Sequence, residues 1–208
     1  MTTRIAVDPG QPDPAAIAQA ATILAAGGVV AYPTETLYGL AVDPRNRDAV
    51  LRLFGLKGRP ESSALTLIAA DMEQARLAGE FGAEAMRLAE GWWPGPLTIV
   101  VAARAGLAAE TLAGGSTVGV RVPGSGVARA LARAFGFCIT ATSANRSGET
   151  PAALPGEVAD RLPGVDLLLD AGPAPGGAPS TIVTVEHGAV SLIRAGAIAW
   201  DRVLESLQ

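Results

Sequence analysis

Residues 29–40 read Val-Val-Ala-Tyr-Pro-Thr-Glu-Thr-Leu-Tyr-Gly-Leu, and this stretch decides how the chain around it is organised. Its first four residues, Val29 to Tyr32, form a short apolar run that predicts a buried strand. Upstream, Pro14 to Ala26 carry apolar side chains at helical spacing, and the pair Gly27-Gly28 ends that predicted helix. A helix followed directly by a buried strand is typical of a sheet covered by helices.

The second half of the stretch leaves the strand through polar residues. Thr34 or Thr36 is placed to cap a short helix that runs through Tyr38 and Leu40. Further out, the helical and strand periods predict the other elements. Helices are expected over 48–56, 71–78, 83–90, 126–135 and 200–207, and strands over 65–70, 97–103, 118–122, 137–141, 165–169, 181–185 and 190–193.

Strands and helices are mixed without strict alternation, and some neighbouring strands are spaced as hairpins while others are spaced as crossovers. This pattern favours an α+β (mixed α/β) fold in which helices flank a mixed sheet. A chain of 208 residues favours one domain, 1–208. The segment Gly172 to Pro179 is linker-like, but it is too short to mark a domain boundary.

Composition excludes several classes of protein. Hydrophobic residues make up 49% of the chain and charged residues 17%, which is ample material for a core. There is no membrane-spanning run, no secretory signal in the first residues, and a single cysteine, Cys138, in an apolar run typical of a core. We therefore expect a cytoplasmic protein. The net charge of −4 argues against a general nucleic-acid coat protein.

The basic residues are unevenly chosen. Fifteen of the sixteen are arginine, and Lys57 is the single lysine. One interpretation is a composition bias that left one lysine behind. The other is that this position needs a compact ammonium on a flexible stem, which arginine does not imitate.

Four polar segments interrupt the apolar pattern where predicted elements end, and binding loops usually lie at such places. They span 32–40, 57–60, 121–123 and 142–148. In the second, Lys57 and Arg59 present two different cations that suit a polyphosphate, although a helix carboxyl end also favours such charges. In the fourth, Ser143 and Asn145 suit phosphate or ribose oxygens, or ordinary turn chemistry. Arg121 is either a surface anchor or a carboxylate clamp.

Metal and triad chemistry are largely excluded. The single histidine, His187, lies between two apolar runs in a predicted hairpin turn, which leaves no Cys/His cluster for zinc and makes a Ser-His-Asp triad implausible. The Lys57 segment does not match a Walker A loop. Any metal is expected to be Mg²⁺ that arrives with the phosphates of a nucleotide, with no site caged by protein ligands.

Seven motifs together resemble the YrdC-like family, the threonylcarbamoyl-AMP synthases, in its short single-domain form. They occur in the family's order over about residues 14–200. The motifs are Tyr-Pro-Thr-Glu-Thr-Leu-Tyr-Gly-Leu at 32–40, Lys-Gly-Arg-Pro at 57–60, Trp-Pro-Gly-Pro-Leu-Thr at 93–98, Val-Gly-Val-Arg-Val-Pro at 118–123, Thr-Ser-Ala-Asn-x-Ser-Gly at 142–148, Ser-Thr-Ile-Val at 180–183 and Ile-Arg-x-Gly-Ala-Ile at 193–198.

The resemblance implies a twisted mixed sheet wrapped by helices around a basic groove. It also implies an ATP-dependent nucleotidyltransferase reaction. Threonine takes up bicarbonate, the resulting N-carboxylate attacks the α-phosphate of ATP, and pyrophosphate leaves threonylcarbamoyl-AMP behind. A separate transferase complex then moves the threonylcarbamoyl group to adenosine 37 of certain tRNAs.

The resemblance also implies roles for residues. Matched positions around ATP are Lys57, Arg59, Thr117, Ser143, Asn145 and Arg194, of which Lys57, Arg59, Ser143 and Asn145 are the expected catalytic set. Matched positions around L-threonine are Thr34, Arg121 and Ser180. Reactions of this kind need positioning and positive charge more than a side-chain nucleophile, which agrees with the residues present.

The chain departs from the family pattern in two places. Ser63 and Ala64 replace a polar residue and a proline, and Ile68 stands where many members have a histidine on the threonine side. These departures favour an alternative, a paralogue that binds nucleotide or RNA with lost or altered synthase activity. Contact with tRNA or double-stranded RNA is a further alternative, against which the net charge of −4 and the lack of a Lys/Arg run weigh.

Overall fold

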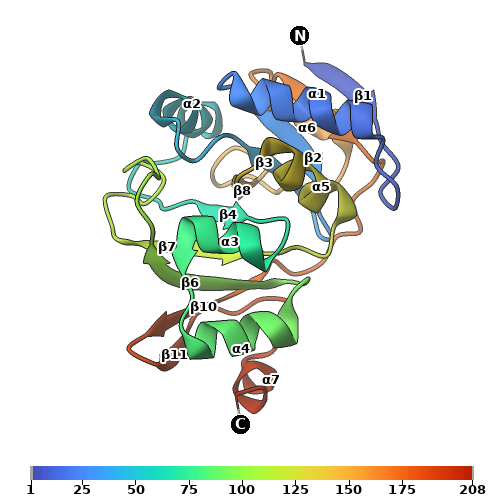
Figure 1. The fold of residues 1–208 in the computed structure, drawn as a ribbon. Coiled ribbons are helices and arrows are strands. Elements are labelled where there is room, and N and C mark those ends of the chain that lie inside the picture. The colour runs from blue at the N-terminus through green and yellow to red at the C-terminus, as the bar shows by residue number, and fades with distance from the viewer. Residues whose placement is uncertain (1, 208) are drawn as a thin grey trace.

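One mixed sheet runs through the computed structural model, which describes residues 2–207 (Figure 1). Its strands are β1 (Thr3–Ala6), β2 (Val30–Pro33), β3 (Tyr38–Ala41), β4 (Thr66–Ile68), β5 (Gly79–Glu80), β6 (Leu97–Ala103), β7 (Thr117–Arg121), β8 (Ile139–Ser143), β9 (Leu167–Asp170), β10 (Thr181–Glu186) and β11 (Ala189–Arg194). The spatial order is β1-β9-β2-β3-β8-β4-β7-β6-β10-β11, and β5 pairs with β6. Parallel and antiparallel pairs both occur, which confirms the predicted mixed sheet.

Helices lie on both faces of this sheet. They are α1 (Pro14–Ala25), α2 (Arg47–Lys57), α3 (Met72–Ala78), α4 (Ala83–Trp92), α5 (Gly126–Phe135), α6 (Pro155–Arg161) and α7 (Trp200–Glu205). The bounds of helix α2 follow from the residues that flank it. Asn46 caps its start, and Gly58 follows its end in the left-handed conformation at φ 59°. No helix among residues 2–207 is long and apolar enough to cross a membrane.

The predicted short helix through Tyr38 and Leu40 is wrong. Strand β3 occupies these residues and pairs antiparallel with β2, with Ala31 opposite Leu40. The Thr34 hydroxyl closes the connection, because it accepts the backbone N–H groups of residues 36 and 37 and donates to the carbonyl of residue 37 at 2.7 Å. The threonine therefore closes a turn between strands, where capping chemistry alone suggested a helix start.

Three further elements were not predicted. Strand β1 lies at the edge of the sheet beside β9, the short β5 pairs with β6, and α6 lies in a segment for which no helix or strand was predicted. The carboxylate of Glu157 accepts the N–H groups of residues 153 and 154, which satisfies the start of this short helix. In contrast, the turn at His187 is confirmed, since this residue has φ 51° between β10 and β11. Cys138 is fully buried, and burial raises its thiol pKa to about 12.

The distribution of helices leaves part of one sheet face open. Helices α2, α3, α4, α6 and α7 cover the face that carries Leu40, Leu67 and Val120. On the opposite face, α1 and α5 pack against each other and against residues such as Tyr32 and Ile68. Over β7, β6 and β10, no helix of the described chain packs its apolar side chains on this second face. The floor of a groove lies on this uncovered part of the sheet.

Candidate functional site

A groove with a volume of about 440 Å³ lies on the open face of the sheet. Six of the nine residues expected in the site line it: Thr34, Arg59, Arg121, Ser143, Ser180 and Arg194. These residues come from loops and strands that are as much as 160 positions apart in the chain (194 − 34). The fold therefore brings together all four polar segments that the sequence separates.

Strand register sets the floor of the groove. Thr66 lies opposite Gly119 and Ile68 lies opposite Arg121 in the parallel pair of β4 and β7, so these four residues share one face of the sheet. The absence of a side chain at Gly119 leaves space in the groove above this strand. A Cβ at this position would lie 3.1 Å from methyl carbons of both Thr66 and Thr98. A larger residue at this position would narrow the groove from below.

Three arginines make the groove basic. Arg59, Arg121 and Arg194 line it, and no aspartate or glutamate is among the lining residues of the described chain. Burial lowers the pKa of Arg194, and the nearby charge of Arg121 lowers it further. Three guanidinium groups, of which only Arg121 has an ion-pair partner among residues 2–207, suit a ligand that carries several negative charges. No group of three or more His, Cys, Asp or Glu residues within 2–207 is arranged to hold a metal ion.

Arg59 forms one wall of the groove, and one of its hydrogen-bond donors has no acceptor among the described residues. One terminal nitrogen donates to the Thr142 hydroxyl at 3.1 Å and the other donates to the Ala64 carbonyl at 2.9 Å. Its Nε is buried and has no partner among the described residues, and burial lowers the pKa of the guanidinium. An unpaired buried donor on a cation indicates where an anionic oxygen would be stabilised.

Lys57 does not line the groove. Its side chain is buried at 3% exposure, and its ammonium donates to the carbonyl oxygen of Ser143 and to that of Asn145 at 2.7 Å. Burial lowers its pKa to about 8, and the charge of Arg59 adds to the effect. Two of its three protons are therefore used to hold the 143–145 loop, and the expected contact with phosphate stays a prediction.

Asn145 lies behind the same loop. Its amide nitrogen donates to the carbonyls of Arg146 at 2.7 Å and Glu149 at 2.9 Å, while its buried side-chain oxygen has no partner among the described residues. Thr117 is also outside the groove lining, since it is exposed at the start of β7 while Arg121 ends the same strand. At about 3.3 Å per residue, the two positions are roughly 13 Å apart.

Arg121 makes an ion pair that the sequence reasoning missed. One of its terminal nitrogens donates to Glu35 Oε1 at 2.9 Å, and the two side chains are only 10% and 23% exposed. The same oxygen accepts the backbone N–H of Gly124 at 3.3 Å. Glu35 therefore holds the guanidinium against one wall and is a positioning residue. Its place in the first motif was visible, but its partner lies 86 positions away.

Ser180, Thr98 and Arg194 form a second wall. The hydroxyls of Thr98 and Ser180 share a hydrogen bond at 2.9 Å, and Arg194 donates to the carbonyl and the hydroxyl of Ser180 at 2.8 and 3.2 Å. Thr98 lines the groove although it was not among the expected site residues. It ends the motif at 93–98, which was the available signal.

Ile68 is an apolar residue of the groove lining, at a position that the family resemblance places on the threonine side. It is fully buried, it lines the groove, and it lies opposite Arg121 in the sheet. A hydroxyl that reached this part of the floor would therefore find its hydrogen-bond partners among other residues, and the nearby hydroxyl groups belong to Thr98 and Ser180.

Comparisons with known proteins identify relatives of this chain. A family model named for Sua5, YciO and YrdC, with the description "Telomere recombination", matches residues 22–196. A threonylcarbamoyl-AMP synthase of Halorhodospira halophila is 47% identical over 146 residues, which is 70% of this chain and 76% of that protein.

Two solved structures share the fold. Sua5 of P. abyssi, complexed with L-threonine, has a TM-score of 0.92 and 31% identity over 99% of this chain, which spans 61% of that longer protein. YciO of E. coli has a TM-score of 0.86 and 27% identity, and the match covers 96% of this chain and 98% of that protein.

Proposed function

The chain belongs to the Sua5/YciO/YrdC family, and from this premise we propose that it is an L-threonylcarbamoyladenylate synthase. Threonine and bicarbonate give an N-carboxylate, with loss of water. The carboxylate oxygen attacks the α-phosphorus of ATP, the bond to the β-phosphate oxygen breaks, and pyrophosphate leaves. The products are threonylcarbamoyl-AMP, pyrophosphate and water.

One observation carries the proposal, namely the convergence of three arginines with threonine and serine hydroxyls in a groove that no acid lines among the described residues. ATP, bicarbonate and the threonine carboxylate are all anions, so a polycationic groove stabilises each of them. Charge also develops on the leaving pyrophosphate, where fixed guanidinium groups act without reorganisation. This chemistry calls for aligned reactants more than for a protein nucleophile.

The nucleotide end of the groove is assigned to Arg59, Ser143 and Arg194, and a role near the nucleotide for Thr117, which lies outside the groove lining, stays a prediction of the resemblance. Lys57 and Asn145 support this end by holding the loop on which Ser143 lies. Arg59 has a free buried donor for a phosphate oxygen. Mg²⁺ is expected to arrive on the phosphates and keep its water ligands, since the lining residues supply no carboxylate.

The amino-acid end is assigned to Thr34, Arg121 and Ser180. Glu35 engages one terminal nitrogen of Arg121, which leaves other N–H groups of the fork for the carboxylate of threonine. A relative, Sua5 of P. abyssi, binds L-threonine, which supports this assignment.

The reaction belongs in the cytoplasm, where ATP and tRNA are available, and a single buried thiol at Cys138 is compatible with a reducing compartment. The product is passed to a separate transferase complex that modifies adenosine 37 of tRNA. The whole chain, 1–208, works as one YrdC-like domain in this role.

The test is pyrophosphate release by the purified protein. Release should require ATP, threonine and bicarbonate together, and a product that contains both AMP and threonine should accumulate. Arg59→Gln should reduce the rate at least about tenfold, while Arg104→Gln, which removes an arginine outside the groove lining, should leave it unchanged. Equal pyrophosphate release without threonine would refute the synthase.

A binding-only paralogue is the second candidate, and the buried apolar Ile68 is the observation that favours it. Such a protein would bind ATP without releasing pyrophosphate. Direct measurement of ATP binding beside the rate assay separates the two, because the synthase shows both binding and turnover.

A further inference from the structure

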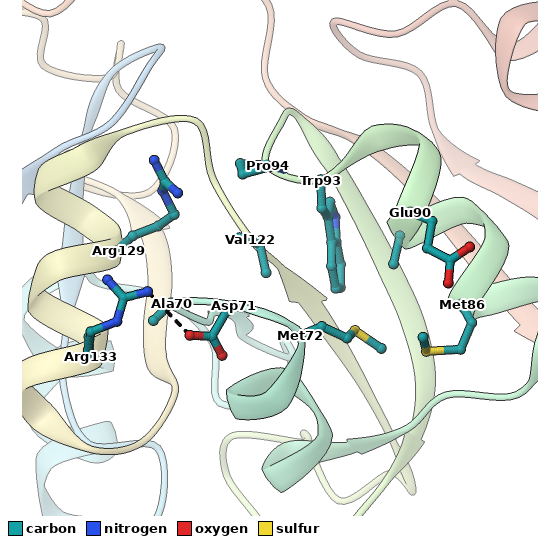
Figure 2. A pocket seen from close by; sticks show the side chains of 11 residues that line it. Ala70, Asp71, Met72, Met86, Glu90, Trp93, Pro94, Val122, Arg129 and Arg133 are labelled. Atoms are coloured by element: carbon teal, nitrogen blue, oxygen red, sulfur yellow. Dashed lines mark hydrogen bonds and ion pairs between the residues drawn. The ribbon is translucent and has the colours of Figure 1, made fainter.

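A second cavity lies at the carboxyl ends of β4 and β7, between α3, α4 and α5 (Figure 2). It has a volume of about 270 Å³ and shares no lining residue with the groove. Its lining residues are Ala70, Asp71, Met72, Met86, Ala89, Glu90, Trp93, Pro94, Val122, Arg129 and Arg133. The proposed synthase reaction uses none of them.

The topology of the sheet explains why a cavity forms there. Strands β4 and β7 are parallel neighbours. The helix that follows β4, α3, packs with Leu67 and Val120, whereas the helix that follows β7, α5, packs with Ile68 on the opposite face. Connections that leave adjacent parallel strands toward opposite faces create a crevice beyond the strand ends, where α/β proteins commonly bind ligands.

The interior of the cavity is apolar and one wall is cationic. Met72, Val122 and Trp93 contribute apolar surface, and Figure 2 shows the Trp93 ring facing the α5 side of the cavity. Arg129 and Arg133 lie on that α5 wall, and in this view Trp93 stands between them and Glu90. An apolar body with an anionic end matches this division.

The two arginines are used differently. Arg133 is paired with Asp71 at 3.2 Å and is exposed. The Arg129 side chain makes no hydrogen bond or ion pair with any residue from 2 to 207, and its Nε is buried without an acceptor. A buried donor on a cation loses the water that would otherwise satisfy it, so its acceptor is expected to come from a ligand.

We propose that this cavity is a binding site for a small monocarboxylate with an aromatic or branched apolar body. The Nε edge of Arg129 binds the carboxylate as a fork, and the apolar body lies against Trp93, Met72 and Val122. The volume of about 270 Å³ admits one ring or branched chain and excludes a nucleotide. The site is separate from the groove and does not depend on the synthase reaction.

Phenylacetate is the probe, and phenylacetamide is its uncharged isostere. Binding is measured by calorimetry and by tryptophan fluorescence, since Trp93 lines the cavity. The variants are Arg129→Gln and, as a matched control, Arg104→Gln, an exposed arginine outside both cavities. Thermal melting verifies that each variant is folded.

Wild type and Arg104→Gln should bind phenylacetate saturably, with Kd of about 1 mM or below. Phenylacetamide on wild type, and phenylacetate on Arg129→Gln, should each bind at least about tenfold more weakly. Absence of saturable phenylacetate binding to the folded wild type overturns the proposal. Equal binding of the amide does the same, and this comparison needs no variant to fold.

Discussion

Replacing Lys57 with arginine preserves the charge and changes the shape, which makes it a sharp test of the site. The lysine stem is enclosed at the end of α2, and its ammonium reaches the carbonyls of Ser143 and Asn145. A guanidinium is larger and planar, so it does not enter this space without moving the 143–145 loop. That loop carries Ser143 into the groove.

The expected loss of stability in Lys57→Arg follows from the burial of the lysine side chain. The lowering of its pKa from 10.5 to about 8 corresponds to a net cost of about 3 kcal/mol for the charged form in this site. A larger cation in the same enclosed space adds to that cost. Overpacking by arginine adds a cost of about 1–3 kcal/mol, or a fall in Tm of roughly 2–12 °C for a domain of this size.

The assay is pyrophosphate release together with thermal unfolding. Lys57→Arg should lower kcat/KM at least about tenfold, which is about 1.4 kcal/mol in the barrier, with the larger effect on KM for ATP. Arg104→Lys is the matched control, and it should change neither quantity. Unchanged kcat/KM and Tm in Lys57→Arg would show that this space accepts a guanidinium, and the single lysine would then be a remnant of composition bias.

Raising the pH from about 7 to about 9 should raise KM for ATP. Lys57, with a pKa of about 8, is mostly charged at the lower pH and mostly neutral at the higher pH. A neutral amine is a weaker hydrogen-bond partner for carbonyls and phosphates than an ammonium. The KM of Lys57→Met should not show this change, and an equal rise in that variant would assign it to another group. Serine and 2-aminobutyrate should replace threonine with losses in kcat/KM below about a hundredfold, because Ile68 offers the threonine hydroxyl no hydrogen-bond partner. A loss of about 10⁴ would indicate that another residue binds this hydroxyl. Duplex RNA should bind weakly and lose affinity steeply as salt is added, and tight binding at physiological salt would instead support an RNA-binding protein.

The sequence predicted those features that depend on neighbouring residues. The helices α2 and α5 lie where apolar spacing and glycine stops indicated, and the turn at His187 follows from two apolar runs that flank a Glu-His-Gly segment. The order of the seven motifs was enough to indicate the family, which the match over residues 22–196 shows. Local periodicity reports secondary structure because it repeats within a few residues.

The conformation of residues 34–40 could not be predicted from neighbouring residues. Thr34 can cap a helix or close a hairpin with the same hydroxyl, and its own neighbours do not distinguish the two. The outcome depends on β2 and β8, since β3 pairs with both of them. Strand pairing joins segments far apart in the chain, and hydrogen bonds between such segments leave no local pattern.

The roles of charged residues were decided by tertiary structure. Sequence indicated Lys57 and Arg121 as important cations, but only the fold turns Lys57 toward two carbonyls and sets Glu35 against Arg121 across 86 positions. The second cavity lies where α3 and α5 leave adjacent parallel strands toward opposite faces. Residue types determine which groups carry charge, whereas the three-dimensional packing of distant segments determines which of them are buried, paired or left free for a ligand.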